Sequence, residues 1–158
     1  RTMIEGIRIG YAVLKQPLAE RLRAAKQLYE PHPSSILEQR ALAAFMRNGQ
    51  YEKHLRRIRR IYRRRAECLV SLLGRRLARL FNPRETDVGL HVFAEWRQKP
   101  EAFDRFIALC AQEGVRFVDA RQNYASDPVA SACFGFAHLD EERIAEGIAR
   151  MARAAERL

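Results

Sequence analysis

The chain has 158 residues, 47% of them hydrophobic, which suits one globular domain that needs neither a metal nor a disulfide to fold. Lysine and arginine total 29 against 19 acidic residues, so the net charge of +10 favours polyanions at low salt. No apolar run approaches the roughly 20 residues of a membrane span, and we expect no membrane partner.

Three cysteines, Cys68, Cys110 and Cys133, lie far apart and have no metal-ligand spacing. They predict reduced, buried thiols in a cytoplasmic protein. The chain begins Arg1-Thr2, and its first methionine is Met3, although an ordered pattern already starts at Thr2. We therefore expect this chain to be a piece of a longer protein.

The first third of the chain predicts a strand followed by two helices. Residues 6–14 are apolar and β-rich, which favours a strand. Residues 18–29 have helical spacing, and Pro17 suits the start of that helix. Residues 35–47 predict a second helix, which ends at Gly49 because glycine readily adopts the left-handed cap conformation.

An arginine-rich helix is predicted over residues 51–80. Seven of the ten residues from Arg56 to Arg65 are arginine, and Gly74 weakens the helix by about 1 kcal/mol relative to alanine. Apolar residues recur at steps of three and four, as in a packed helix: Leu55, Ile58, Tyr62, Ala66, Leu69, Leu73, Leu77 and Leu80. We interpret the helix first as a packing element whose arginines are solvated or face an interface. Direct contact with nucleic acid is one alternative, and contact with a membrane or another acidic surface is the other.

After Asn82-Pro83 the pattern changes to alternating strands and helices. Strands are predicted over residues 88–96, 115–119 and 130–136. Helices are predicted over residues 100–114, ending at Gly114, and from Leu139 to the end of the chain. The predicted fold class is α+β: a small antiparallel or mixed sheet with helices on one side, plus a long helix.

Several segments together resemble the MocR-type regulators of the GntR superfamily. They are residues 36–45, residues 49–65, Ile7-Arg8-Ile9-Gly10-Tyr11, Gly89-Leu90-His91 and Phe134-Gly135-Phe136-Ala137. Such proteins join an N-terminal winged helix to a domain like the fold-type-I, pyridoxal-phosphate-dependent aminotransferases. The resemblance implies the C-terminal part of that domain. Its predicted divisions are the end of the large subdomain (1–48), a long interdomain helix (49–80) and a small α+β subdomain (81–158).

The same resemblance implies roles for particular residues. Arg8 matches an arginine that contacts the phosphate of pyridoxal phosphate, for which a planar guanidinium is well suited. The lysine that forms the Schiff base in the family falls at Arg1, which stays protonated and cannot form that bond. Either the match slips by a residue or two there, or this protein has lost the lysine.

A second departure from the family is Cys133, which stands where many relatives hold the substrate carboxylate with an arginine. We expect this chain alone to be inactive as an enzyme. His91 is expected to be structural, whereas Tyr11, Tyr29 and Tyr124 are candidates to approach a cofactor.

Three functions are compatible with the sequence. The first is the effector domain of a MocR-type transcriptional regulator that binds pyridoxal phosphate and an amine or amino-acid effector, forms a homodimer, and meets DNA only through its winged helix. The second is a fragment of an aminotransferase of the aminoadipate type. The third is a free-standing basic nucleic-acid-binding protein.

Overall fold

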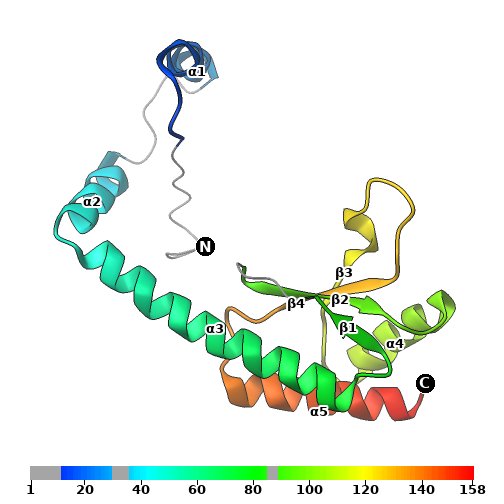
Figure 1. Cartoon of the computed structure of the whole chain (residues 1–158). Helices are drawn as coiled ribbons and strands as arrows, with labels where there is room; N and C mark the ends of the chain where they lie inside the picture. Colours follow the sequence, from blue (N-terminus) through cyan, green and yellow to red (C-terminus); the bar gives the residue numbers. More distant parts are fainter. Residues whose placement is uncertain (1–11, 30–35, 85–88) are drawn as a thin grey trace. The chain divides into compact units, whose positions relative to one another are not determined.

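The computed structural model describes residues 12–29, 36–84 and 89–158, and the chain divides into two compact units, residues 1–58 and 59–158. The first unit contains helices α1 (Gln16–Tyr29) and α2 (Ile36–Arg47) and the start of α3 (Gln50–Arg76), shown in Figure 1. Neither α1 nor α2 has a buried residue, so both present leucines to solvent.

The strand predicted over residues 6–14 is not found where the structure describes it. Residues 6–11 lie outside the described residues, and residues 12–14 belong to no strand. A strand exists only when its backbone pairs with a neighbour. Within the described ranges no segment pairs with residues 12–14.

The turn between α2 and α3 follows the prediction. Gly49 has a φ of +72°, the left-handed conformation expected of a residue that ends a helix. The Gln50 amide donates to the Asn48 side chain at 3.1 Å, which satisfies one of the free donors at the start of α3. The Phe45 ring lies edge-on to Tyr51, with centroids 6.1 Å apart.

Helix α3 ends earlier than the predicted Leu80. It stops at Arg76, and the chain then turns: the Leu80 and Phe81 amides each donate to the Leu77 carbonyl at 2.9 Å. The apolar spacing in the sequence extends past the end of the helix to Leu80. It does so because Leu77 and Leu80, which lie in the turn, still pack against the core. Gly74 does not interrupt the helix.

The second unit contains one four-stranded antiparallel sheet with the order β1-β2-β4-β3. Its strands are β1 (Phe81–Pro83), β2 (His91–Trp96), β3 (Val118–Asp119) and β4 (Ser131–Gly135). The predicted α+β class is confirmed. The prediction missed β1 because Pro83 was interpreted as a break, whereas an edge strand tolerates proline.

Two further details differ from the sequence prediction. Strand β3 covers only Val118–Asp119 of the predicted 115–119. A short 3-10 helix, η2 (Ala120–Asn123), follows β3 between the predicted strands 115–119 and 130–136, where no element was predicted. It forms because the Asp119 side chain accepts from the Arg121 amide at 3.0 Å and caps its first turn.

Helices α4 (Pro100–Gln112) and α5 (Glu141–Glu156) have well-defined ends. The Asp140 side chain accepts from the Arg143 amide at 2.9 Å at the start of α5. At the end of α4, Gly114 has a φ of +74° and the Val115 amide donates to the Cys110 carbonyl at 2.9 Å. This is a Schellman motif, and it confirms the predicted end at Gly114.

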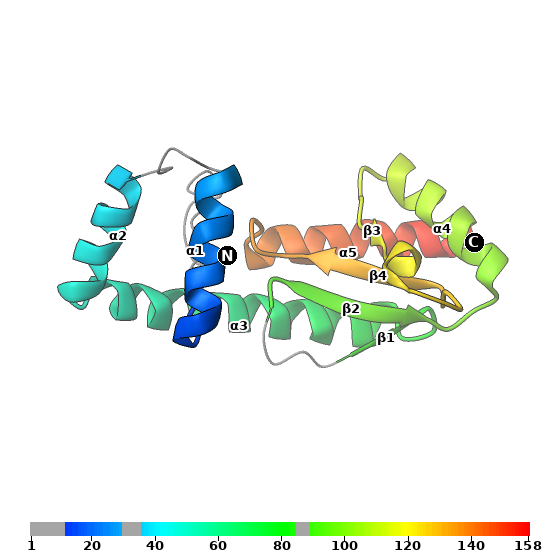
Figure 2. The same cartoon turned by 90° about the horizontal axis from the view of Figure 1, so that it is seen from above.

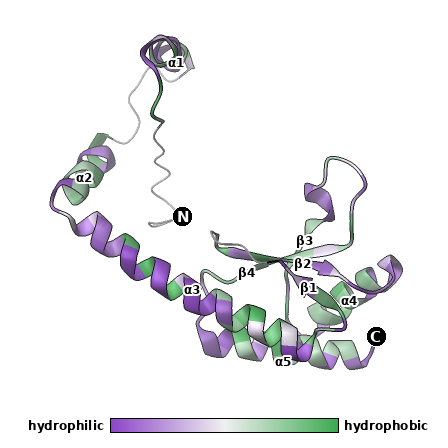
Figure 3. Cartoon of the chain, in the orientation of Figure 1, coloured by the Kyte–Doolittle hydropathy of each residue, from purple (hydrophilic) through white to green (hydrophobic). Residues whose placement is uncertain are grey.

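The core lies between the sheet and the helices on one of its faces. Helices α3, α4 and α5 cover that face, as the two views in Figures 1 and 2 agree. Hydrophobic segments of α4 are visible in Figure 3, and buried residues of α4 and α5 belong to this core. The largest fully buried side chains are Phe81, Phe103, Phe106, Phe136, Leu73, Leu77 and Met151.

Two glycine-to-alanine substitutions are expected to have opposite effects. Gly114→Ala should lower the free energy of unfolding by about 1–2 kcal/mol, because Gly114 has a φ of +74°, which a β-carbon disfavours. Gly74→Ala should raise it by up to about 1 kcal/mol, because Gly74 lies inside α3 and a β-carbon there meets nothing within 4 Å. Urea unfolding of both variants measures this difference, and equal shifts would contradict it.

Candidate functional site

The face of the sheet opposite the helices carries the candidate site residues. We call this the open sheet face and define it by His91, Phe93 and Glu95 of β2 with Cys133 and Gly135 of β4. The neighbouring residues of β2, namely Val92, Ala94 and Trp96, are buried on the helix side. Side chains alternate between the faces of a strand, which places the five residues on one surface.

His91 lies at the start of β2, directly opposite Gly135 of β4. A β-carbon on Gly135 would lie 3.4 Å from Cδ2 of the His91 ring, so the imidazole lies against the Gly135 backbone. The ring is exposed rather than in the core. Its expected structural role stays a prediction.

Cys133 pairs with Phe93 on one side and with Val118 of β3 on the other. Its side chain is half-buried, and desolvation raises the pKa of the thiol above its ordinary value. The thiol is therefore neutral near pH 7 and does not supply the positive charge that holds a carboxylate.

The one acidic residue of the open sheet face, Glu95, is already paired. Its carboxylate accepts from Arg84 with an N–O distance of 2.7 Å. The charge of Arg84, which lies outside the five residues of this face, offsets the charge of Glu95. Phe93 and Cys133 at its centre are apolar in character, so this surface suits an uncharged part of a ligand.

Several predicted site residues cannot be related to this face. Arg1, Arg8 and Tyr11 lie outside the described residues. Tyr29 ends α1 in the first unit and is 82% exposed, whereas the half-buried Tyr124 follows η2 in the second unit. The predicted phosphate contact of Arg8 stays a prediction.

The described residues do not by themselves fit a covalent pyridoxal-phosphate site. Such a lysine needs a lowered pKa, which burial or a nearby cation provides. All four lysines of the chain, Lys15, Lys26, Lys53 and Lys99, are exposed. Over the described ranges, moreover, no group of three metal-ligating side chains gathers.

A charged cluster that the sequence did not predict joins α4 to β3 and η2. The Arg121 guanidinium pairs with Asp119 at 2.6 Å and with Asp104, and it lies 5.2 Å from the centre of the Phe103 ring. The hydrogen bond from Arg121 lowers the pKa of the Asp119 carboxyl. These contacts hold the short strand β3 against the core.

The Asp119–Arg121 pair predicts a pH dependence of stability. Because the pKa of Asp119 is lower in the folded chain, its contribution is present above the unfolded pKa of roughly 4 and is lost as the pH falls through the folded value. Asp119→Asn keeps the capping oxygen but removes the charge. In urea unfolding, the free energy of unfolding of the wild type should exceed that of Asp119→Asn most near pH 7, and the difference should shrink toward pH 2. A difference that does not change with pH would contradict the ionic origin.

The predicted state of the cysteines is only partly correct. All three are free, but only Cys110 is buried, and desolvation raises the pKa of its thiol to about 12. Cys68 and Cys133 are half-buried. Cys68 flanks the packed side of α3, and Cys133 is on the open sheet face, so neither position is fully covered.

This small sheet with helices on one face, preceded by a long helix, is the arrangement of an aminotransferase C-terminal subdomain. The family model "Aminotransferase class I and II" matches residues 3–151, and the chain belongs to this family. No described helix is long and apolar enough to cross a membrane.

The chain is also similar to transcriptional regulators and to enzymes of this family. It is 34% identical to the probable rhizopine catabolism regulatory protein MocR of Rhizobium meliloti, over 94% of this chain and 30% of that protein. It is 26% identical to 2-aminoadipate transaminase of Thermus thermophilus, over 98% of this chain and 38% of the enzyme.

A solved structure agrees with this assignment. The structure of LysN, an alpha-aminoadipate aminotransferase from Thermus thermophilus, matches with a TM-score of 0.83 and 27% identity, over 96% of this chain and 38% of the enzyme. The chain thus spans 30–38% of the length of these three relatives.

Proposed function

We propose that this chain is the C-terminal portion of the effector domain of a MocR-type transcriptional regulator. The observation that carries the proposal is the 34% identity to the MocR protein of Rhizobium meliloti, which extends over 94% of this chain. HTH-type regulators of Bacillus subtilis and Rhodobacter capsulatus are similar over 98% of it. In the complete protein, a winged helix would bind the operator and this domain would bind the effector.

The complete protein would bind pyridoxal phosphate. Arg8 would hold the phosphate, since its planar guanidinium matches two phosphate oxygens. The bound cofactor supplies an electron sink for amino compounds. The family model and the cofactor adduct named in the LysN structure support this proposal.

The effector would be a small amine or amino acid, and the protein would act as a homodimer. The open sheet face favours an effector that does not depend on an arginine–carboxylate pair there, because Cys133 is a neutral thiol. Regulation then requires the effector to bind one arrangement of the complete protein more tightly than another.

An aminotransferase of the aminoadipate type is the second candidate, because the 2-aminoadipate transaminase matches 98% of this chain. Sequencing the gene upstream of the codon for Arg1 separates the two candidates. A winged-helix segment and a linker before the aminotransferase-like domain would support the regulator. An upstream region that encodes only the rest of an aminotransferase domain would contradict the regulator and support the enzyme.

The isolated chain is expected to form no specific covalent adduct with pyridoxal phosphate. Each of its four lysines is exposed, and the resemblance puts the Schiff-base lysine of the family at Arg1 or within a residue or two of it. After borohydride reduction, peptide mass spectrometry should find only low, similar labelling of the four lysines, and a sample without borohydride is the control. One lysine labelled stoichiometrically would contradict the expectation.

A further inference from the structure

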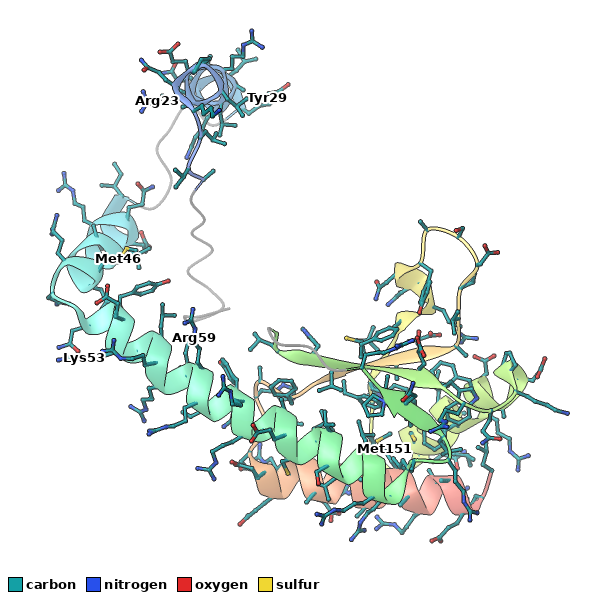
Figure 4. All side chains as sticks on the ribbon, viewed as in Figure 1. Arg23, Tyr29, Met46, Lys53, Arg59 and Met151 are labelled. Carbon is teal, nitrogen blue, oxygen red and sulfur yellow. The ribbon has the colours of Figure 1, made fainter. Side chains whose placement is uncertain are left out.

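The middle of α3 carries a group of exposed arginines. We call it the arginine face and define it by Arg59, Arg60, Arg63 and Arg64, all exposed. Arg59 projects from the helix in Figure 4, and the hydrophilic colour of this part of α3 is visible in Figure 3. Arg65 is different: it is half-buried and donates to the Ala137 carbonyl at 2.7 Å.

The four arginines are exposed and lie beside the packed stripe of α3 rather than within it. Tyr62, Ala66 and Leu69 of that stripe contact the core, which holds this part of the helix against the rest of the second unit. With 3.6 residues per turn, positions three and four apart stand one above the other. The four arginines therefore form a compact, rigidly supported patch rather than a ring around the helix.

These arginines have almost no acidic partners. The described residues give one ion pair on this face, Arg64 with Glu141 at 3.2 Å, and its side chains are 71% and 41% exposed. Such an exposed pair contributes little in water. Arg59 with Arg63 and Arg60 with Arg64 are like charges at i and i+4, which weaken a helix. This arrangement of like charges does not stabilise the helix, but it suits a surface that binds anions.

We propose that the arginine face is a second contact with duplex DNA, made to the phosphate backbone without reading the base sequence. A guanidinium pairs with phosphate oxygens through two parallel N–H groups, and neutralising phosphates releases counterions. The choice of DNA among double-stranded polyanions rests on the proposed regulatory function. The contact itself rests on the arginines.

Two other anionic partners fit this surface less well. A helix that binds membranes inserts an apolar side, but here Leu69 and Leu73 are buried in the core. A surface for single strands offers aromatic rings on which bases stack, whereas Tyr62, the aromatic residue within this part of α3, packs against the core. Duplex phosphates need only the charge and the spacing that the helix provides.

The test uses the 158-residue chain itself and a fluorescent duplex of about 20 base pairs, with anisotropy measured across a salt series. The variant replaces Arg59, Arg60 and Arg63 with glutamine and keeps Arg64 with its partner Glu141. The control replaces Arg75, Arg76 and Arg79, which are also exposed, and removes the same charge. Circular dichroism checks that both variants remain folded.

The wild-type chain and the control should bind with a similar dependence on salt, and duplexes of two different sequences should bind alike. The arginine-face variant should lose about 0.9 in the slope of log affinity against log salt for each lost contact, so up to about 3 in total. Equal losses in both variants, strong sequence preference, or tighter binding to phosphatidylserine vesicles than to DNA would each overturn the proposal. That failure would leave the regulatory function standing, because the upstream gene sequence tests it separately.

Discussion

Replacing Phe81 with alanine is expected to lower the free energy of unfolding by about 3–5 kcal/mol, the usual range for a buried phenylalanine. Phe81 is 1% exposed and lies at the centre of an aromatic cluster. Its ring centroid lies 5.2 Å from Trp96, 5.3 Å from Phe134 and 5.7 Å from Phe106. Alanine would remove these contacts and leave a cavity between β1, β2, α4 and β4, which the surrounding rings fill only in part.

Asn82→Ala is the matched control for Phe81→Ala. Asn82 is the next residue of β1, and its side chain is exposed. Its replacement should change the free energy of unfolding by less than about 0.5 kcal/mol. Urea unfolding followed by tryptophan fluorescence and by circular dichroism measures both variants. Similar effects at the two positions would mean that strand β1 matters through its backbone and not through the Phe81 ring.

Replacing Leu69 with alanine is expected to lower the free energy of unfolding by about 2–5 kcal/mol, the range for a leucine in a core. Leu69 is 5% exposed and belongs to the hydrophobic core. The size of the loss depends on how far the neighbouring side chains close the space. An effect under about 0.5 kcal/mol would show that the apolar stripe of α3 is not a packing surface.

Ser71→Ala tests the same helix without touching the core, since Ser71 is exposed two residues after Leu69. Alanine has the higher helix propensity, so the variant should be as stable as the wild type or slightly more stable. Thermal and urea unfolding of the pair separate the contribution of helix formation from that of packing. A loss at Ser71 as large as the loss at Leu69 would point to the helix backbone instead.

The strongly periodic parts of the fold were predictable from the sequence. The stripe through Leu69 and Leu73 predicted a long packed helix, and Gly114 predicted the end of α4 because few other residues adopt a φ of +74°. Strand β1 was not predictable in the same way. Its three residues are too few to show alternation, and they form a strand because β2 supplies the hydrogen-bonding partners.

The candidate site, like the fold, was predictable from the sequence only in part. The open sheet face follows from the alternation of β2, which puts His91, Phe93 and Glu95 on one surface. The pairing of Arg121 with Asp104 and Asp119 joins residues from α4 and from the β3–η2 turn, and no local pattern in the sequence indicates that contact. The sequence showed the number of arginines on α3, but only the structure separates the paired Arg65 from the exposed ones.

The order of the strands has a consequence for solubility. The edges of the sheet are β1, with three residues ending in Pro83, and β3, with two residues. Short edges and an edge proline offer few free backbone groups to another chain, and they discourage the edge-to-edge pairing that begins aggregation. The sheet therefore protects its own edges from pairing with another chain.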